Sequence, residues 1–160
     1  MILVVLGTHE LPFKRLLEQV EKQIDAGIID EEVIVQNGHT AFKSKKMTFI
    51  PFMSYQQMEE LYDQASLIIT HGGTGSITQG IKIGKKMIAV PRLKKYGEHN
   101  DDHQIEIVEQ FSNSNHLLKW TDEDDLGLTI KEARVFQPEP FTSGRVKILS
   151  ILETFIDQNE

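Results

Sequence analysis

The sequence contains no cysteine, which excludes disulfide bonds, thiolate zinc sites and cysteine nucleophiles. It also lacks any apolar run that approaches the roughly 20 residues of a membrane-spanning helix. The apolar residues 1–6 have no basic segment before them and no small-residue cleavage site after them, so we do not expect a signal peptide. We therefore expect a cytoplasmic protein, which would need another molecule to hold it at a membrane.

Basic residues are outnumbered. Lysine and arginine together number 17, against 24 aspartate and glutamate residues, and the net charge is -7. Nonspecific binding to nucleic acid or to anionic lipid rewards clustered positive charge. We therefore expect no nucleic-acid partner.

Two glycine motifs of common nucleotide-binding proteins are missing. No stretch matches Gly-x-x-x-x-Gly-Lys-Ser/Thr, the motif of the P-loop. The turn after the first apolar run, residues 7–10 (GTHE), lacks the Gly-x-Gly-x-x-Gly of dinucleotide-binding enzymes. Neither of these nucleotide-binding classes is therefore expected.

What the sequence does contain is an alternation of short apolar runs and segments with helical spacing. With 160 residues, of which 39% are hydrophobic, the chain fits one domain over residues 1–160. Strands are predicted at residues 1–6, 33–36, 47–52, 66–70, 87–90 and 116–119. Helices are predicted at residues 13–24, 55–64, 75–83 and 102–111. A further helix is predicted to begin with an acidic first turn at residues 122–124. A last helix is predicted at residues 143–158, where it is available to pack on a partner. This pattern predicts an α/β fold, a single Rossmann-like domain with a parallel sheet covered on both faces.

A glycine cluster, residues 71–76 (HGGTGS), lies between the fourth predicted strand and the next predicted helix. Ligands of open parallel sheets bind beyond the carboxyl ends of the strands. The three glycines let the backbone approach a ligand, and the N–H groups of residues 74–76 at a helix N-terminus suit an anion. The alternative is a tight strand-to-helix turn with Ser76 as its N-cap. The leading His71 and the position at a strand end favour phosphate binding.

A second polar run, residues 98–104 (EHNDDHQ), follows the fifth predicted strand. It suits sugar hydroxyls or a metal ion, although His99 and His103 would share a helix face only if the helix began before Asn100. Asp102 is a candidate helix cap instead. For His103 and Gln104, spacing alone leaves the functional and the structural interpretation open.

Together, residues 71–76, residues 84–91 (GKKMIAVP) and Asp102-His103-Gln104 resemble the C-terminal half of family 28 glycosyltransferases of the GT-B type. The resemblance covers nearly the whole chain. Chains of this length that begin with a strand followed by Gly-Thr look most like a two-subunit subgroup of the family. That subgroup includes bacterial capsular and exopolysaccharide subunits that transfer galactose or glucuronic acid, and the catalytic subunit of the dolichyl-diphosphate N-acetylglucosamine transferase.

The resemblance implies a role for each matching position. His71 would stabilise the leaving group, and Gln79 stands where the family usually has an acid that holds the ribose, so a charge-assisted contact is lost. Residues 49–53 would lie where the family holds the uracil base. The donor diphosphate would meet Thr8, Gly73, Thr74, Gly75 and Ser76. The donor sugar would meet Asp102, His103 and Gln104.

The resemblance also implies a function, that of the catalytic, donor-binding subunit of a two-component inverting glycosyltransferase. The donor would be a UDP-sugar, with galactose favoured, and the acceptor a lipid-diphosphate-linked glycan in capsule or exopolysaccharide synthesis. A membrane-anchored partner would bind the acceptor and bring the chain to the cytoplasmic face of the membrane. The implied mechanism uses no cofactor and no divalent metal. The general base would lie on the partner, and His9 is the candidate within this chain.

Two other functions remain open from the sequence. A noncatalytic nucleotide-sugar-binding regulatory subunit is the first alternative, supported by Gln79 and by the missing base. A UDP-sugar epimerase is the second, and it would need a further acid/base set within this chain.

Overall fold

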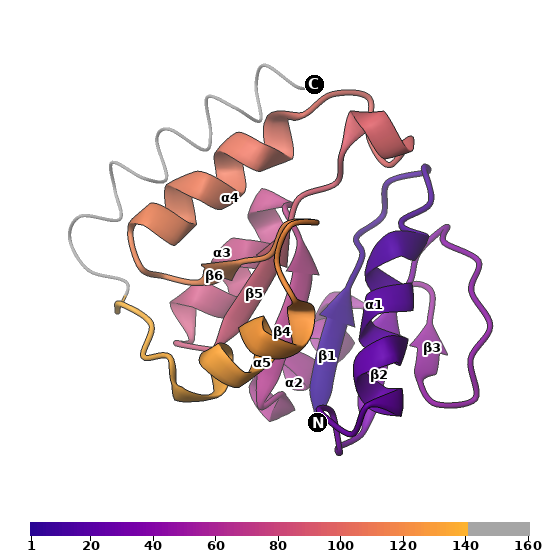
Figure 1. Cartoon of the computed structure of the whole chain (residues 1–160), viewed down its shortest axis with the longest axis horizontal. Coiled ribbons are helices and arrows are strands. Elements are labelled where there is room, and N and C mark those ends of the chain that lie inside the picture. Colours follow the sequence, from indigo (N-terminus) through magenta and orange to yellow (C-terminus); the bar gives the residue numbers. More distant parts are fainter. Residues whose placement is uncertain (141–160) are drawn as a thin grey trace.

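The computed structural model describes residues 1–140 and shows one six-stranded sheet in the order β3-β2-β1-β4-β5-β6 (Figure 1). Each pair of neighbouring strands is parallel. The strands are β1 (Ile2–Val5), β2 (Val33–Gln36), β3 (Thr48–Ile50), β4 (Leu67–His71), β5 (Met87–Val90) and β6 (Leu118–Lys119). The strand order reverses between β1 and β4, and such a reversal opens a crevice beyond the carboxyl ends of the two strands. The predicted α/β fold with a parallel sheet is confirmed.

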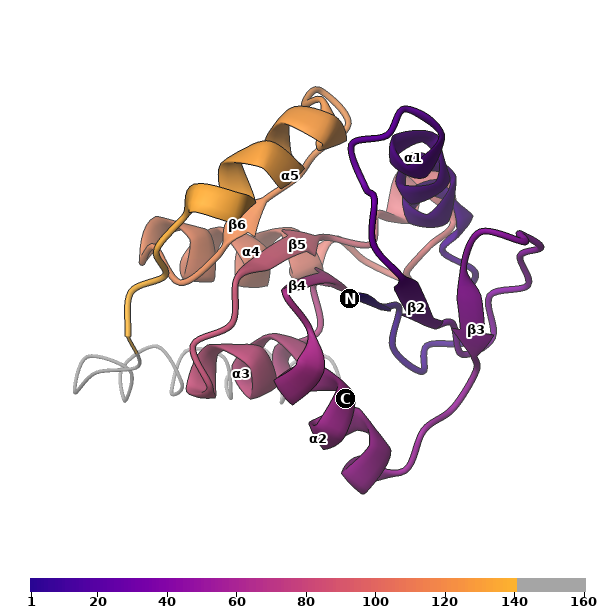
Figure 2. The ribbon, with the colours of Figure 1, turned by 90° about the horizontal axis from the view of Figure 1, so that it is seen from below.

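Helices cover both faces of the sheet. In Figure 2, α1 and α5 lie on one side of it, and α2 and α3 lie on the other. Phe111 of α4 packs into the same core cluster as Ile77 of α3, so α4 belongs to the second side. The helices are α1 (Lys14–Asp25), α2 (Tyr55–Gln64), α3 (Thr74–Lys82), α4 (His103–Asn113) and α5 (Leu126–Val135), with a short 3-10 helix η1 (Lys94–Tyr96) after β5.

The core forms because alternate residues of the central strands point to opposite faces. Val4 of β1 packs with Leu17 of α1 and Ile130 of α5, whereas Leu3 packs with the helices of the other side. All four residues of β1 are buried, as expected of a strand covered on both faces. Central strands covered in this way place their polar loops at the two ends of the sheet.

The expected acidic first turn at residues 122–124 is wrong. α5 begins at Leu126, and its N-cap is Asp125, whose side chain accepts a hydrogen bond from the Gly127 N–H. The Asp124 carboxylate instead accepts from the Thr121 N–H and hydroxyl. Short acidic side chains readily form such local turns in place of a helix. The predicted helix at residues 143–158 lies outside the described residues.

None of the helices in residues 1–140 is both long enough and apolar enough to span a membrane.

Candidate functional site

A cavity of about 280 Å³ lies at the carboxyl ends of β1 and β4, where the strand order reverses. The loop after β1 and the first turn of α3 both line it. Phe52 and Met53, from the segment predicted to lie near a base, also line it. Residues that the sequence predicts at a diphosphate and that share this cavity are Thr8, His71, Gly73, Gly75 and Ser76.

The first turn of α3 supplies hydrogen-bond donors at this cavity. α3 begins at Thr74 and its N-cap is Gly73, so the alternative of Ser76 as the N-cap is wrong. The first N–H groups of an α-helix have no partners inside the helix, and the helix dipole adds partial positive charge there. The cavity therefore offers the environment that an anion prefers.

The glycines of the cluster have different roles. A Cβ atom at Gly73 would overlap Cε1 of His71, and one at Gly72 would lie 2.9 Å from Cβ of Gln104. Gly7, with a φ of +81°, lies against the same ring, and a Cβ there would lie 2.6 Å from Nε2 of His71. A Cβ at Gly75 would meet nothing within 4 Å. The predicted role of letting a ligand approach therefore fits Gly75, whereas Gly72 and Gly73 make room for His71 and Gln104.

His71 is a buried, neutral histidine. Burial is the largest cause that lowers the pKa of His71 from 6.5 to about 3, and the positive charges of Arg92, His99 and His9 are the smaller causes. Its Nε2 atom lies 3.2 Å from Oγ of Ser76. At neutral pH the ring can therefore contribute a hydrogen bond to the cavity, but no charge.

The depressed pKa of His71 makes stability depend on pH. Between the folded pKa of about 3 and the unfolded value near 6.5, the unfolded state binds one more proton, so the contribution of His71 to stability is full above pH 6.5 and falls as the pH drops. From pH 7.5 to pH 5.5 we expect this histidine to remove about 1.4 kcal/mol of unfolding free energy. Urea unfolding at both values should show a smaller pH dependence in His71→Gln. The exposed His39 provides the control, because His39→Gln should retain the wild-type dependence.

The run after β5 places Gln104 inside the protein. Gln104 is 7% exposed. Its Oε1 atom accepts hydrogen bonds from the N–H groups of Gly72 and Arg92, at 3.0 and 2.9 Å. Its Nε2 atom lies 3.4 Å from Nδ1 of His71. Gln104 therefore joins the ends of β4 and β5, and its predicted contact with a donor sugar stays a prediction.

Asp102 and His103 lie nearer the surface. Asp102 occupies the N-cap position of α4, but its side chain accepts from the Lys94 N–H rather than from the helix. Asp101 accepts from the His103 N–H in its place, so capping by Asp102 itself is wrong. Within residues 1–140 no three His, Asp or Glu side chains are arranged to hold a metal ion. The metal interpretation of His99 and His103 therefore has no support, and the predicted sugar contacts of Asp102 and His103 stay predictions.

His9 presents a proton rather than a lone pair. Its Nδ1 atom accepts a hydrogen bond from the Leu11 N–H at 3.1 Å, so a neutral ring carries its proton on Nε2. The ring stacks on His99 with centroids 4.5 Å apart. Burial, followed by the charges of His99 and Arg92, lowers the pKa of His9. A base role would require His9 to give up the Leu11 hydrogen bond.

Gln79 lies outside the cavity of His71. It lines a neighbouring cavity of about 470 Å³ between α2 and α3, and Gly75 borders both cavities. Its Nε2 atom is buried and has no hydrogen-bond partner within residues 1–140. A ligand that reached Gln79 from the His71 cavity would pass over Gly75, so the ribose contact stays a prediction.

Two residues that shape the site are absent from the sequence prediction. The Gln36 amide, at the end of β2, accepts from the Gly7 N–H and donates to the carbonyls of Gly7 and Pro51. Arg92, buried just after β5, donates to three backbone carbonyls from two loops and the end of β1. Those carbonyls belong to Leu6, Leu11 and Glu98, at 2.6, 2.7 and 3.0 Å. The available signal for both was a polar residue at the end of a strand, the last residue of β2 and the second residue after β5.

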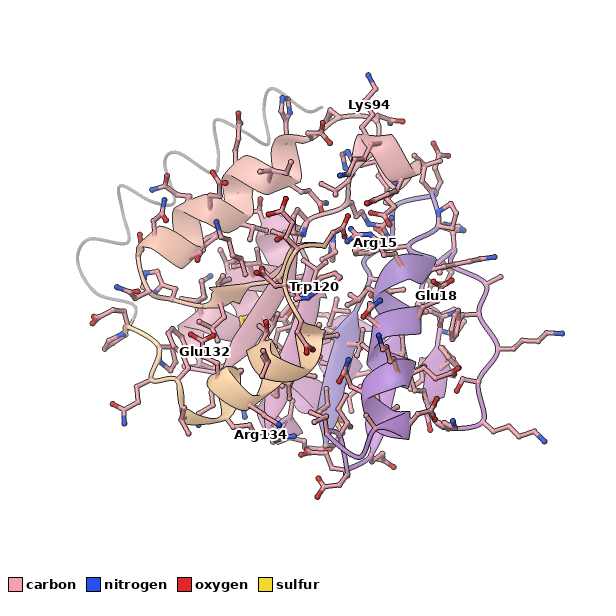
Figure 3. The ribbon with its side chains drawn as sticks, viewed as in Figure 1. Arg15, Glu18, Lys94, Trp120, Glu132 and Arg134 are labelled. Atoms are coloured by element: carbon pink, nitrogen blue, oxygen red, sulfur yellow. The ribbon has the colours of Figure 1, made fainter. Side chains whose placement is uncertain are left out.

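The loop after β5 is fixed by Arg15 of α1. Arg15 forms an ion pair with Glu98 at 2.9 Å and also donates to the Pro91 carbonyl. Figure 3 shows Arg15 beside Trp120, whose ring lies 5.6 Å from the guanidinium carbon. Trp120 is itself buried. This loop carries His99, so Arg15 helps to hold the histidine that packs against His9.

Comparison with known proteins places the chain in a family. Residues 1–157 match the glycosyltransferase family 28 C-terminal domain. The UDP-N-acetylglucosamine transferase subunit ALG13 of Yarrowia lipolytica is 29% identical over 138 residues, which are 79% of this chain and 68% of that protein. UDP-N-acetylglucosamine--N-acetylmuramyl-(pentapeptide) pyrophosphoryl-undecaprenol N-acetylglucosamine transferase of Trichodesmium erythraeum is 30% identical over 87 residues, or 54% of this chain and 22% of that protein.

Solved structures show the same fold. The glycotransferase of kitacinnamycin matches 98% of this chain and 39% of its own, with a TM-score of 0.60 and 19% identity. The solution structure of ALG13 matches 86% of this chain and 87% of its own, with a TM-score of 0.53 and 19% identity. The chain thus spans well under half of the glycotransferase but most of the ALG13 structure. Because the family match covers residues 1–157, the chain belongs to the glycosyltransferase family 28 C-terminal domain family.

Proposed function

We propose that the chain binds a UDP-sugar and is the donor-binding subunit of a two-component, inverting glycosyltransferase. The observation that carries the proposal is the cavity at the strand reversal, where His71 and Ser76 meet at the first turn of α3. Thr8 lines the same cavity. Helix N–H groups and neutral donors at a strand end are suited to a diphosphate.

In the proposed mechanism, this chain stabilises the leaving group. The acceptor hydroxyl oxygen forms a bond to the anomeric carbon, the bond from that carbon to the diphosphate oxygen breaks, and its electron pair leaves with UDP. The N-terminus of α3 donates hydrogen bonds to the charge that develops on the diphosphate, and so does the Ser76 hydroxyl, which pairs with His71. The hydroxyl proton passes to a base on the partner subunit, since the His9 ring presents a proton. No divalent ion is required in this proposal.

The names of the relatives and the motif resemblance favour different donor sugars. The names of the Yarrowia and Trichodesmium relatives contain N-acetylglucosamine transferase, whereas the motif resemblance favours galactose. UDP-N-acetylglucosamine is therefore the first donor to test and UDP-galactose the second. The proposed acceptor is a sugar on a lipid diphosphate, held by a membrane-anchored partner at the cytoplasmic face.

Transfer by the reconstituted pair tests this function. The chain and its partner are incubated with a glycosyl-diphospho-lipid and each of a panel of UDP-sugars, and lipid-linked product is measured. If no UDP-sugar gave a lipid-linked product, the proposed function would be refuted. A noncatalytic regulatory subunit predicts that His71→Ala leaves the rate of the pair unchanged, whereas the donor-binding subunit predicts a loss of rate.

Ser76→Tyr should block the donor. The tyrosine ring would fill the space at the first turn of α3, and we expect UDP to bind at least about tenfold more weakly, a loss of about 1.4 kcal/mol or more. Isothermal titration calorimetry with UDP measures it. Thr48→Tyr, on the exposed edge strand β3, is the matched control and should bind UDP as the wild type does. Equal affinity in the two variants would show that the diphosphate binds elsewhere.

A further inference from the structure

The Gln104 side chain can adopt only one amide orientation in this fold. Two backbone N–H groups, those of Gly72 and Arg92, point at the same terminal atom. An amide NH2 group cannot accept hydrogen bonds, so this atom must be the oxygen. The two N–H groups belong to the first residue after β4 and the second residue after β5. The ends of two strands therefore fix the direction of the amide.

This orientation places the amide nitrogen against His71. The Gln104 Nε2 atom lies 3.4 Å from Nδ1 of the ring. Since the amide nitrogen only donates, Nδ1 must hold a lone pair, and the single proton of a neutral ring must be on Nε2. The Nε2 atom lies 3.2 Å from Oγ of Ser76, so this proton is donated to the serine.

We infer that Gln104 is a positioning residue that sets the tautomer of His71, so that the His71–Ser76 pair presents a hydrogen-bond donor to a bound diphosphate. With the imidazole proton on its oxygen, Ser76 directs its own proton elsewhere, and the cavity is the open side. The donors then run in one direction, from the backbone through Gln104, His71 and Ser76 to the ligand. Hydrogen bonds aligned in this way polarise and strengthen one another. The part of the inference that concerns the ligand rests on the proposed function.

Packing keeps this arrangement in place. Gly7 and Gly73 both lie so close to the His71 ring that neither can carry a Cβ atom without a shift. Gly72 likewise leaves room for Gln104, where a Cβ would lie 2.9 Å from the Cβ of that residue. The Tyr62 hydroxyl donates to the Ser76 carbonyl at 2.9 Å and holds the backbone of the serine. The side chains therefore have little freedom to exchange donor and acceptor roles.

The tautomer of His71 can be observed without any substrate. The full chain, labelled with ¹⁵N-histidine, is studied by long-range ¹H–¹⁵N correlation at neutral pH, with His71 assigned from the spectrum of His71→Gln. We expect a protonated Nε2 and a bare Nδ1. In Gln104→Glu, one carboxylate oxygen still accepts from Gly72 and Arg92, but the other now accepts from the ring, and we expect a proton on Nδ1.

Gln110→Glu, on the same helix, is the matched control for the added charge and should keep the wild-type tautomer. A protonated Nδ1 in the wild type would overturn the inference, and so would a bare Nδ1 in Gln104→Glu. Because the glutamate preserves both backbone hydrogen bonds, the variant is expected to fold, which its amide spectrum checks.

UDP binding tests the step from the tautomer to the ligand. In Gln104→Glu at neutral pH, a neutral ring protonated on Nδ1 accepts the Ser76 proton, and UDP should bind about tenfold more weakly. A changed tautomer with unchanged UDP affinity would refute the role at the ligand. If the wild type binds no UDP at all, the proposed function fails, while the NMR comparison still decides whether Gln104 sets the tautomer.

Discussion

Replacing Arg92 with methionine is expected to lower the free energy of unfolding by about 3 kcal/mol, because it leaves the buried carbonyls of Leu6 and Glu98 without partners. A buried acceptor that loses its donor costs about 1–3 kcal/mol. The methionine recovers part of the contact that the guanidinium makes with Phe13, whose ring centre lies 5.0 Å away. Urea unfolding followed by circular dichroism measures the loss.

Arg134→Met is the matched control. Arg134 lies at the surface of the molecule in Figure 3 and pairs with Glu31 at 3.0 Å. A partly exposed ion pair at the surface contributes about 0–1 kcal/mol. Arg92→Lys should restore only part of the stability, since one ammonium group does not reproduce the planar fork that spans separate carbonyls. Equal losses in Arg92→Met and Arg134→Met would show that the three carbonyls do not depend on Arg92.

Gly73→Ala should reduce UDP binding by roughly a hundredfold, or about 2.7 kcal/mol. It should also lower the free energy of unfolding by about 1–3 kcal/mol. The φ of Gly73 is -75°, which alanine adopts without strain, so the backbone gives no reason for a loss. The loss arises because the new methyl group would overlap the His71 ring. Displacing this ring removes the donor to Ser76 and disturbs the first turn of α3. Calorimetry with UDP and urea unfolding measure the two effects.

A double-mutant cycle shows whether the ring causes the loss. In a His71→Ala background the methyl group has room, so Gly73→Ala should then cost less than about 0.5 kcal/mol of stability. Gly75→Ala is the matched control for stability, because its methyl group would meet open space and alanine favours a helix. If Gly73→Ala lowers the free energy of unfolding equally with and without His71, the glycine is required for a reason other than contact with the ring.

The fold is predictable from local patterns. β1, β5 and the first three residues of β4 are short runs of aliphatic residues that are buried on both faces, and such runs are easily recognised in a sequence. Glycines and polar residues mark the ends of these strands, so the position of the site at their carboxyl ends is predictable as well. The family resemblance is confirmed by the match over residues 1–157.

The hydrogen bonds of the site are not predictable in this way, because they join residues far apart in the sequence. Gln104 bonds to Gly72 across 32 positions, and Arg92 bonds to Leu6 across 86. A glycine in a motif also does not reveal whether its missing Cβ makes room for a ligand or for a side chain. Only the placement of His71 shows that Gly73 serves the side chain. Likewise, whether Asp101 or Asp102 bonds to the start of α4 depends on where η1 places the Lys94 N–H.

Within residues 1–140 the two edge strands of the sheet are short, with three residues in β3 and two in β6. Association by adding a strand from another chain needs a longer row of free backbone groups. A companion protein would therefore gain little by extending this sheet sideways. The loops at the carboxyl ends of the strands offer more polar groups for contact. A protein that docked on these loops would cover the cavity lined by His71 and Ser76, together with any ligand bound in it.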